Sequence, residues 1–288
     1  MCRFIAYLGH DTLIENMLAK PVNSLVCQSL HARESDMPTN GDGFGLGWYV
    51  PDVSAEPALF KSIQPAWNDS NLLNLAAKIK SPCFLAHVRA ASHGGVSHDN
   101  CHPFIHQNYL FMHNGGIYNF AKIKRHLRHL LEDDVYESIQ GETDSEHAFH
   151  LFLQLAKGRD LSDIETVAQT LEETIAKIEQ LISAYGAQGE SNLNFVLTDG
   201  KQLVACRYNT EGSNTSRTLH YSVGKNFVKK ADRYHMIKGN GIPECVMITS
   251  EKLTDFNCEW QDVPVNHLVT VSQGAGNEKV VQHRKLCI

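Results

Sequence analysis

The alternation of apolar and polar side chains predicts several β-strands along this chain. Residues 2–8 alternate and are rich in strand-favouring residues, which predicts a strand that places the N-terminus at one end of a sheet. Residues 81–89 form an apolar run typical of a buried strand, and residues 109–113 form another that breaks at Asn114-Gly115-Gly116. Later strands, with a hairpin turn at Asp199-Gly200, are predicted at residues 193–198, 203–208, 218–223, 245–250 and 267–272.

Apolar residues at helical spacing predict helices as well. The first two, at residues 11–19 and 70–80, are short. Two more are predicted at residues 119–131 and 161–185, and the second of these is long and amphipathic. A further helix, over residues 143–157, begins at Thr143-Asp144-Ser145-Glu146, where Thr143 is the cap and Glu146, three positions on, completes a capping box.

Strands at both ends of the chain with helices between them indicate an α+β fold built in layers. In such a fold the late strands pair with the early ones. The sequence contains no linker and no internal repeat, so we predict a single domain over residues 2–288. A chain of 288 residues is long enough to bury a full core.

Composition indicates a globular protein that acts on small molecules. Apolar residues make up 42% of the chain and charged residues 20%, as in globular rather than disordered proteins. No apolar run reaches the roughly 20 residues of a membrane span, and there is no signal peptide, so we expect a cytoplasmic protein and no membrane partner. With a net charge of −6 and no basic block, we expect no nucleic-acid partner. The eight cysteines include no C-x-x-C pair, so neither disulfides nor a zinc ribbon are expected.

Cys2 is the first candidate for catalysis. A side chain this small in the second position normally allows the initiator Met1 to be removed, which would make Cys2 the first residue of the mature protein. Its free α-amine, with a pKa of roughly 7.7–8.0, could then activate its own thiol directly or through one water. The alternative is an ordinary strand cysteine, and a retained Met1 would cap the amine.

Four glycines stand at alternate positions in residues 41–50, just before an aromatic strand. This pattern favours tight backbone packing, because glycine lets another chain segment approach closely. A phosphate-binding loop is the alternative, but the segment lacks the lysine and the following helix that such a loop needs.

A cluster of histidines suggests a metal-dependent hydrolase as one hypothesis. The cluster consists of His87, His93, His98, His102, His106 and His113. None of them stands in an H-E-x-x-H helix or at the usual spacing of zinc ligands. Hydrogen-bonded loop histidines are therefore favoured, and we predict no metal and no cofactor.

Several polar residues could bind the head of an α-amino acid beside a thiol. Arg89 ends the predicted buried strand, and its planar guanidinium suits a carboxylate. Asp144 stands at a helix start, where the dipole favours its charge, and could receive an ammonium group.

Asn114 and Gly115 could aim two N–H groups at a developing oxyanion. The simpler interpretations are structural ion pairs for the charged residues and a turn for Asn114 and Gly115.

Taken together, Cys2 and five ordered motifs resemble the class II glutamine amidotransferases of the N-terminal-nucleophile hydrolase superfamily. The motifs are Gly41-Asp42-Gly43-Phe44-Gly45, His87-Val88-Arg89-Ala90-Ala91-Ser92-His93-Gly94, Asn100-Cys101-His102-Pro103-Phe104, His113-Asn114-Gly115 and Glu142-Thr143-Asp144-Ser145-Glu146. Ser250-Glu251-Lys252-Leu253-Thr254 and Trp260 look like the stand-alone branch of that family. That branch includes γ-glutamyl hydrolases of ergothioneine biosynthesis and the glutaminase-like subunit of a glutathione-degrading complex. The resemblance covers nearly the whole chain.

The resemblance implies a fold and a set of catalytic residues. The fold is a four-layer α/β/β/α sandwich. Cys2 would be the nucleophile that forms a γ-glutamyl thioester, and Asn114 and Gly115 would form the oxyanion hole. The implied reaction is cleavage of the γ-glutamyl amide of glutamine or of another γ-glutamyl compound.

The resemblance also implies how the substrate is bound. Arg89 would bind its α-carboxylate and Asp144 its α-amine, with Ser92 and His93 lining the same pocket. Two positions depart from synthase-linked members, which often carry a tryptophan in place of Ala90 and a glycine in place of Arg3. Released ammonia or amine is expected to diffuse away or to pass to a separate ammonia-accepting or amidase subunit. The alternative function is a non-catalytic, regulatory subunit that binds a glutamine-like ligand for a partner enzyme.

Overall fold

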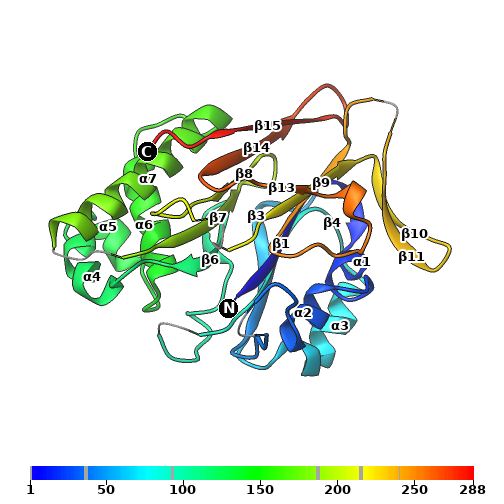
Figure 1. Ribbon diagram of the computed structural model, residues 1–288, viewed down its shortest axis with the longest axis horizontal. Helices are drawn as coiled ribbons and strands as arrows, with labels where there is room; N and C mark the ends of the chain where they lie inside the picture. The colour runs from blue at the N-terminus through cyan, green and yellow to red at the C-terminus, as the bar shows by residue number, and fades with distance from the viewer. Residues whose placement is uncertain (1, 36–37, 92–93, 186–188, 214–216, 240) are drawn as a thin grey trace.

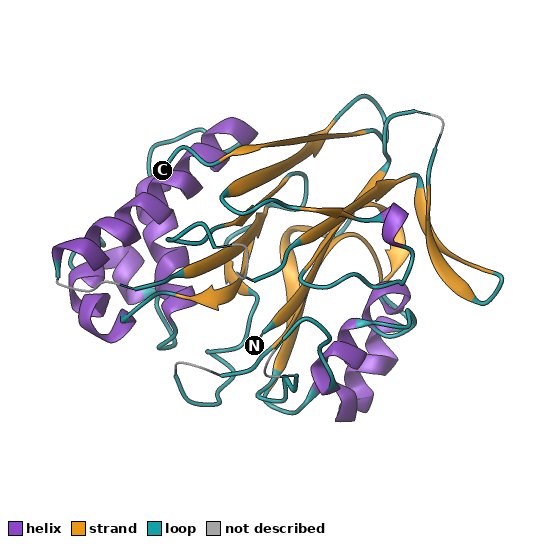
Figure 2. Ribbon diagram, in the orientation of Figure 1, coloured by secondary structure: helices purple, strands orange, loops and turns teal. Residues whose placement is uncertain are grey.

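Two antiparallel sheets pack face to face between two layers of helices (Figure 1). The computed structural model describes residues 2–35, 38–91, 94–185, 189–213, 217–239 and 241–288. Figure 2 shows the helices in two groups, one outside each sheet. The architecture is therefore α+β with the four layers α/β/β/α, as the resemblance implied.

The first sheet has seven strands and contains β1 (Arg3–Leu13) in its interior. The order across this sheet is β13 (Gln261–Asp262), β9 (His220–Gly224), β12 (Cys245–Thr249), β1, β4 (Lys80–Val88), β2 (Phe44–Val50) and β3 (Ser54–Ser62). Ile5 of β1 lies opposite Thr249 on one side and Ala86 on the other. The prediction that late strands pair with early ones is thus confirmed for β12 and β1.

The second sheet has six strands and also joins early and late parts of the chain. Their order is β15 (Lys279–Lys285), β14 (His267–Gln273), β8 (Leu203–Arg207), β7 (Asn192–Thr198), β6 (Tyr109–Gly116) and β5 (Phe104–His106). A separate hairpin of β10 (Asn226–Lys230) and β11 (Arg233–Ile237) projects at one edge of the molecule (Figure 1).

The helices divide between the two outer layers (Figure 1). Outside the first sheet lie α1 (Glu15–Leu18), α2 (Leu25–Leu30) and α3 (Ser70–Ala76). Outside the second sheet lie α4 (Phe120–Arg128), α5 (Asp133–Glu137), α6 (Asp144–Ala156) and α7 (Ile164–Ala184). Two short 3₁₀ turns are η1 (Ala66–Asn68) and η2 (Asn257–Glu259). Within the described ranges, no helix combines the length and apolar character that a membrane span requires.

Three clusters of buried apolar side chains fill the three interfaces between the layers. The one between the two sheets, which we call the inter-sheet core, includes Leu85, Met112, Val196 and Ile248. Successive side chains of a strand point to opposite faces. In β1, Phe4, Ala6 and Leu8 therefore enter the inter-sheet core, whereas Ile5 and Tyr7 pack toward the helices of the first layer.

The glycines of β2 lie against β6 and the segment that leads into β5, as the tight-packing prediction required. A Cβ atom at Gly45 would overlap the carbonyl of His102, and one at Gly47 would lie 2.7 Å from Leu110 Cδ1. Any side chain at these positions would push the sheets apart. The alternative of a phosphate-binding loop gains no support, because these residues continue a paired strand rather than open a helix.

The predicted helix at residues 11–19 is wrong in its first half. β1 continues to Leu13, where Thr12 and Leu13 pair with Ser81 and Lys80 of β4 after an irregularity that follows Leu8. Within residues 11–19, only those of α1 are helical. Pairing with β4 supplies hydrogen bonds that a short isolated helix would have to make alone, so tertiary contacts override the local pattern.

Residues 114–116 were predicted as a strand end, and this is also wrong. β6 runs through Gly116, because Asn114, Gly115 and Gly116 pair with residues 192–194 of β7.

The sequence analysis also missed several elements altogether, namely α2, α5, β3, β5, β10, β11, β13 and β15.

The helix α6 starts at the predicted cap but has only half of the predicted capping box. Thr143 Oγ1 accepts the N–H of Glu146 at 3.1 Å. The Glu146 carboxylate does not bind back to Thr143 but accepts the N–H groups of Gln140 and Gly141 at 2.8 and 2.7 Å. Glu146 thereby holds the loop that leads into the helix.

Candidate active site

Cys2 lies immediately before β1, at the end of the space between the two sheets. It stands two positions before Phe4, so the alternation of the strand directs its side chain to the inter-sheet face. Its thiol donates to the carbonyl of Ala90 across 3.5 Å. The sulfur is thus next to the residue that follows Arg89.

The surroundings of Cys2 favour the neutral thiol. Burial raises the pKa of the thiol, while the positive charges of Arg89 and Arg3 act in the opposite direction without cancelling it. Only the thiolate attacks carbon efficiently. A nucleophilic Cys2 would therefore need a base that removes its proton during the reaction.

Arg3 points to the opposite face of β1 and forms a buried ion pair behind the cysteine. Its Nε donates to Glu251 Oε1 at 2.6 Å, and the two side chains are 2% and 0% exposed. Its Nη1 donates to the carbonyl of Cys2 at 2.8 Å. The main chain of Cys2 is therefore fixed by a charge that is itself paired.

The same ion pair holds the segment at residues 33–34. Glu251 accepts the N–H groups of Arg33 and Glu34 at 2.9 and 3.0 Å, and Arg3 Nη2 donates to the carbonyl of Glu34 at 2.7 Å. This segment consequently borders the start of β1.

Arg89 follows β4 and is only 2% exposed. Its Nη1 donates to the carbonyl of Gly95 at 3.1 Å and its Nη2 to that of Gly94 at 3.3 Å. The backbone of Arg89 continues the pairing with the glycine segment, since its N–H donates to the carbonyl of Gly43 at 2.8 Å. A guanidinium held in this way has a fixed position at the strand end.

Asp144 is the first residue of α6 and lies beside the end of β6. Its Oδ2 accepts the N–H of Ile117 at 2.8 Å, and its Oδ1 accepts the N–H of Ser145 at 2.9 Å. A Cβ at Gly116 would lie 3.8 Å from its Oδ2. The carboxylate is therefore close to the strand that carries Asn114 and Gly115.

Asn114 and Gly115 lie in the last part of β6, opposite Asn194 and Leu193. Asn114 is 1% exposed and shares the inter-sheet face with Met112, and its Nδ2 lies 3.2 Å from Ser250 Oγ of the first sheet. A Cβ at Gly115, where φ is +155°, would overlap the carbonyl of Asn192. Only glycine fits at this position.

Asn100 connects the surroundings of Arg89 with those of Asp144. Its Nδ2 donates to the carbonyl of Gly95 at 2.8 Å, the same oxygen that Arg89 binds. Its Oδ1 accepts the N–H of Glu142 at 2.9 Å, two residues before Asp144. One amide thus ties together the two segments that carry the charged side chains.

The structure therefore brings the described candidate residues close to one another. Cys2 contacts Ala90, the residue after Arg89, and Asn114 contacts Ser250. Asp144 lies beside Gly116, at the end of the strand that carries Asn114 and Gly115. We call the four side chains on the inter-sheet face there, Cys2, Arg89, Asn114 and Ser250, the polar end. Met1, Ser92 and His93 are outside the described residues, so their predicted roles remain predictions.

The model of the family described as glutamine amidotransferases class-II matches residues 12–286. The chain belongs to the class II glutamine amidotransferase family.

Named relatives cover almost the whole length of this chain. The chain is 36% identical to the "Probable glutamine amidotransferase DUG3" of Saccharomyces cerevisiae, over 95% of this chain and 82% of that protein. It is 26% identical to the "Gamma-glutamyl-hercynylcysteine sulfoxide hydrolase" of Mycolicibacterium smegmatis, over 94% and 96% of the two chains. The resemblance to the stand-alone branch of the family is thereby confirmed.

Solved structures support the fold. A glutamine aminotransferase class-II domain protein from Silicibacter pomeroyi superposes with a TM-score of 0.68 at 23% identity and covers 100% of both chains. The glutamine phosphoribosylpyrophosphate amidotransferase of B. subtilis superposes with a TM-score of 0.61 at 14% identity, over 100% of this chain and 50% of that one. At these identities the likeness concerns the fold alone.

The buried histidines of the predicted cluster make stacking contacts and hydrogen bonds. The rings of His87 and His102 stack with centroids 4.1 Å apart, and burial lowers the pKa of His87 to about 3. His113 Nδ1 lies 2.8 Å from Ser145 Oγ. Across the described ranges, no three His, Cys, Asp or Glu side chains converge as ligands of one metal ion. The metal hypothesis gains no support from this arrangement.

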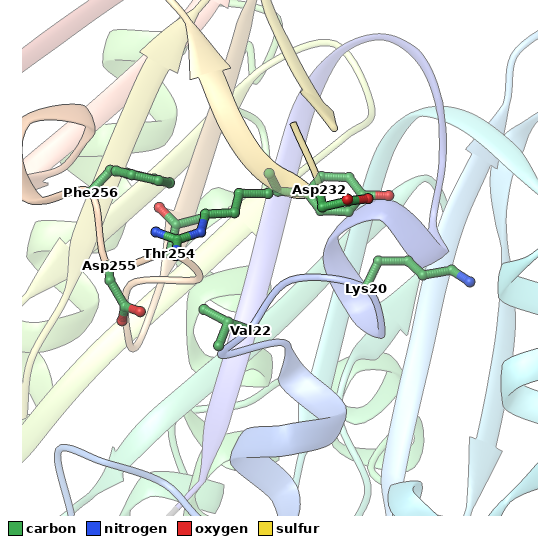
Figure 3. A pocket seen from close by; sticks show the side chains of 8 residues that line it. Lys20, Val22, Asp232, Thr254, Asp255 and Phe256 are labelled. Carbon is green, nitrogen blue, oxygen red and sulfur yellow. The ribbon is translucent and has the colours of Figure 1, made fainter. Parts of the chain in front are cut away.

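A cavity of about 340 Å³ opens elsewhere on the protein. Figure 3 shows its walls, which come from Lys20 and Val22 after α1, Asp232 in the β10–β11 turn, and Asp255 and Phe256. None of the candidate site residues that the structure describes lines it, so we do not connect it with the chemistry of Cys2.

Three further residues of the site were not assigned by the sequence analysis, namely Asn100, Ser250 and Glu251. Alternation along β12 places Ser250 on the same face as Ile248, and Glu251 on the face of Met247. That signal is present in the sequence, but it becomes informative only once β12 is known to pair with β1 in the observed register. Asn100 lies in a loop, where no periodicity applies.

Proposed function

We propose that this protein cleaves the γ-glutamyl amide bond of glutamine or of another γ-glutamyl compound through a thioester at Cys2. The observation that carries the proposal is the convergence of strand ends from both sheets, which bear Cys2, Arg89 and Asn114 on the inter-sheet face. The names of the relatives, a glutamine amidotransferase and a γ-glutamyl hydrolase, support the same class of reaction.

Arg89 and Asp144 hold the amino-acid head of the substrate in this proposal. The guanidinium of Arg89 binds the α-carboxylate with charge-assisted hydrogen bonds, and the carboxylate of Asp144 binds the α-ammonium group. Their link through Asn100 supports a fixed spacing between the two charges. Ser92 and His93 line the same pocket in the proposal. The side-chain amide of the substrate then extends toward Cys2.

The α-amine of Cys2 serves as the base that the raised thiol pKa requires. It removes the thiol proton, the sulfur attacks the amide carbon, and the carbonyl oxygen becomes an oxyanion. Asn114 Nδ2–H and Gly115 N–H stabilise that oxyanion. The protonated α-amine then gives its proton to the leaving nitrogen, and the C–N bond breaks to leave a γ-glutamyl thioester.

Water completes the cycle. The α-amine, neutral again, takes a proton from water as the oxygen attacks the thioester carbon. The second oxyanion collapses, the C–S bond breaks, and the sulfur regains the proton. Glutamate leaves, and the site returns to its starting state without a cofactor.

Glutamate release by the protein without Met1 tests the proposal. Wild type is expected to release glutamate from at least one member of a panel of glutamine and γ-glutamyl amides, whereas Cys2→Ala is expected to fall to the background, because it has no nucleophile. A covalent γ-glutamyl adduct on Cys2 in intact-mass spectra of quenched reactions would confirm the thioester. Equal rates for wild type and Cys2→Ala would contradict the proposal.

The role of the amine needs a separate control. An uncleaved N-terminal tag keeps Cys2 but removes its free amine, so tagged protein is expected to lose glutamate release and to regain it after the tag is cleaved before Cys2. Intact mass of each preparation shows whether Met1 is present. Activity that survives the tag would contradict amine catalysis while leaving the cysteine nucleophile in place.

The fate of the leaving group and the cytoplasmic location belong to the same proposal. Ammonia or amine either diffuses into solvent or passes to a separate subunit. Copurification of a second enzyme that consumes the released amine would support the latter.

A further inference from the structure

The amide of Asn114 has an incomplete set of hydrogen bonds. Its Nδ2 lies 3.2 Å from Ser250 Oγ, but its Oδ1 is buried without a hydrogen-bond partner among the described residues. A buried acceptor that makes no hydrogen bond costs about 1–3 kcal/mol. The residue is 1% exposed, so bulk water does not compensate.

Ser250 occupies the point where the pairing of β12 with β1 ends. Its N–H donates to the carbonyl of Phe4 at 3.1 Å. The N–H of Phe4 donates to Ser250 Oγ, also at 3.1 Å, and the Ser250 carbonyl accepts instead from Thr218 Oγ1 at 2.9 Å. The serine hydroxyl therefore takes the place of a backbone carbonyl in the strand pairing. Its oxygen accepts the N–H of Phe4, and its own O–H remains able to donate a hydrogen bond.

A half-turn of the Asn114 amide about its Cβ–Cγ bond gives Oδ1 the hydrogen-bond donor that it lacks and leaves Nδ2 free for a ligand. The turn exchanges Oδ1 and Nδ2 within nearly the same volume. Oδ1 then faces Ser250 Oγ and accepts a hydrogen bond from the serine hydroxyl. The buried oxygen thereby gains the donor that it otherwise lacks. Both N–H bonds of Nδ2 are released from the serine, and they are available to bind an oxyanion.

We infer that Ser250 is a positioning residue that orients the Asn114 amide, with Oγ–H donating to Oδ1 so that Nδ2 faces the reacting carbonyl. The inference rests on the proposed function, since it concerns the same oxyanion. Ser250 is linked to Phe4, two residues from Cys2, and to Asn114. It therefore sets the oxyanion donor relative to the nucleophile across the two sheets.

Kinetics of Ser250→Ala test this role. Without the hydroxyl, the amide loses the contact that selects its orientation, and kcat is expected to fall on the order of tenfold, the factor that corresponds to one net hydrogen bond. KM is expected to stay within about twofold, because the oxyanion forms only after binding. Ser250→Cys retains a weak donor of similar size and is expected to fall between the two, which keeps the test open if the alanine variant does not fold.

A double-mutant cycle separates positioning from a general structural effect. If Ser250 acts through Asn114, then Ser250→Ala made in an Asn114→Ala background should change kcat by less than about twofold. A loss in that background as large as in wild type would assign the effect to the contact with Phe4 and would overturn the inference.

Thr249 provides a matched control on the same strand. Its Oγ1 is buried without a hydrogen-bond partner among the described residues, and it lies on the other face of β12 from Ser250. Thr249→Val removes an adjacent hydroxyl at nearly constant volume and is expected to leave kcat unchanged. Wild-type kcat in Ser250→Ala would contradict the inference alone, whereas a wild type that releases no glutamate would contradict the proposed function and the inference with it.

Discussion

The space between the two sheets changes character along a single strand. In the inter-sheet core, β12 contributes Val246 and Ile248, which meet apolar side chains of the opposite sheet. Two residues further, the same face carries Ser250, which is bonded to Asn114 of that opposite sheet. Ser250 follows the last paired residue of β12, and there its hydroxyl accepts the N–H of Phe4 in place of a backbone carbonyl. A polar side chain is therefore accommodated between the sheets where the pairing of β12 with β1 ends.

The two faces of β1 differ in a similar way at its first residues. Cys2 is on the inter-sheet face, next to the groups proposed to bind and activate the substrate. Arg3 is on the helix face, where Glu251 neutralises it and the backbone of residues 33–34 closes around the pair. The helix face therefore fixes the start of β1 through a buried ion pair, whereas the inter-sheet face carries the proposed nucleophile.

Glu251→Ala is expected to have the largest effect on stability, because it leaves the Arg3 guanidinium buried without its carboxylate. Loss of one partner of a buried pair costs about 3–5 kcal/mol of the free energy of unfolding. Urea unfolding of the purified variant measures the loss. Asp255→Ala is the matched control, since its 2.8 Å pair with Arg33 is exposed and is expected to contribute less than about 1 kcal/mol. Equal losses of unfolding free energy in the two variants would contradict a special stabilising role for the buried Arg3–Glu251 pair.

Asn114→Ala is expected to act on the reaction and much less on the fold. Removal of one oxyanion donor lowers kcat about 10²–10³-fold, with little change in KM. Steady-state glutamate release at saturating substrate measures this, with urea unfolding as the control for folding. A fall in stability with an unchanged kcat would place Asn114 with the inter-sheet core rather than with the polar end.

Acidification is expected to destabilise the folded protein through its buried histidines. Burial lowers the pKa of His87 to about 3 and also lowers that of His102, so the unfolded chain binds protons that the folded chain does not. The free energy of unfolding is then greatest above pH 6.5 and falls by about 1.4 kcal/mol per pH unit for each such histidine below it. Urea unfolding at pH 7.5 and 5.5 tests this, with His87→Phe expected to reduce the slope. A slope unchanged by this variant would contradict a neutral, buried His87.

Ile248→Val is expected to have the smallest effect and only on stability. The removal of one methyl group from a side chain that is 0% exposed costs about 0.5–1.5 kcal/mol. The kcat of the folded protein should not change, although Ile248 is two residues from Ser250 on the same face. A reduced kcat, measured together with thermal unfolding, would show that the inter-sheet core and the polar end are not separable.

The local part of this architecture could be predicted from the sequence, and the long-range part could not. The start of β1, the cap at Thr143 and the strand before Arg89 follow from periodicity and capping within a few residues. The extension of β1 to Leu13 depends on partners in β4, which no local pattern reveals.

The same limit applies to the candidate site. Cys2, Arg89, Asn114 and Asp144 could be proposed from their chemistry and the family resemblance. The contacts of Ser250 with Asn114 and of Glu251 with Arg3 join residues that are far apart in the sequence, and they depend on the register of β12 against β1. A single sequence does not determine that register.

The interior position of β1 has a consequence for how the protein is made. Its partner β12 is among the last strands to leave the ribosome, so the backbone of β1 lacks that neighbour during most of translation. The contacts of Phe4 with Ser250 and of Arg3 with Glu251 therefore form only when synthesis of the chain is almost complete.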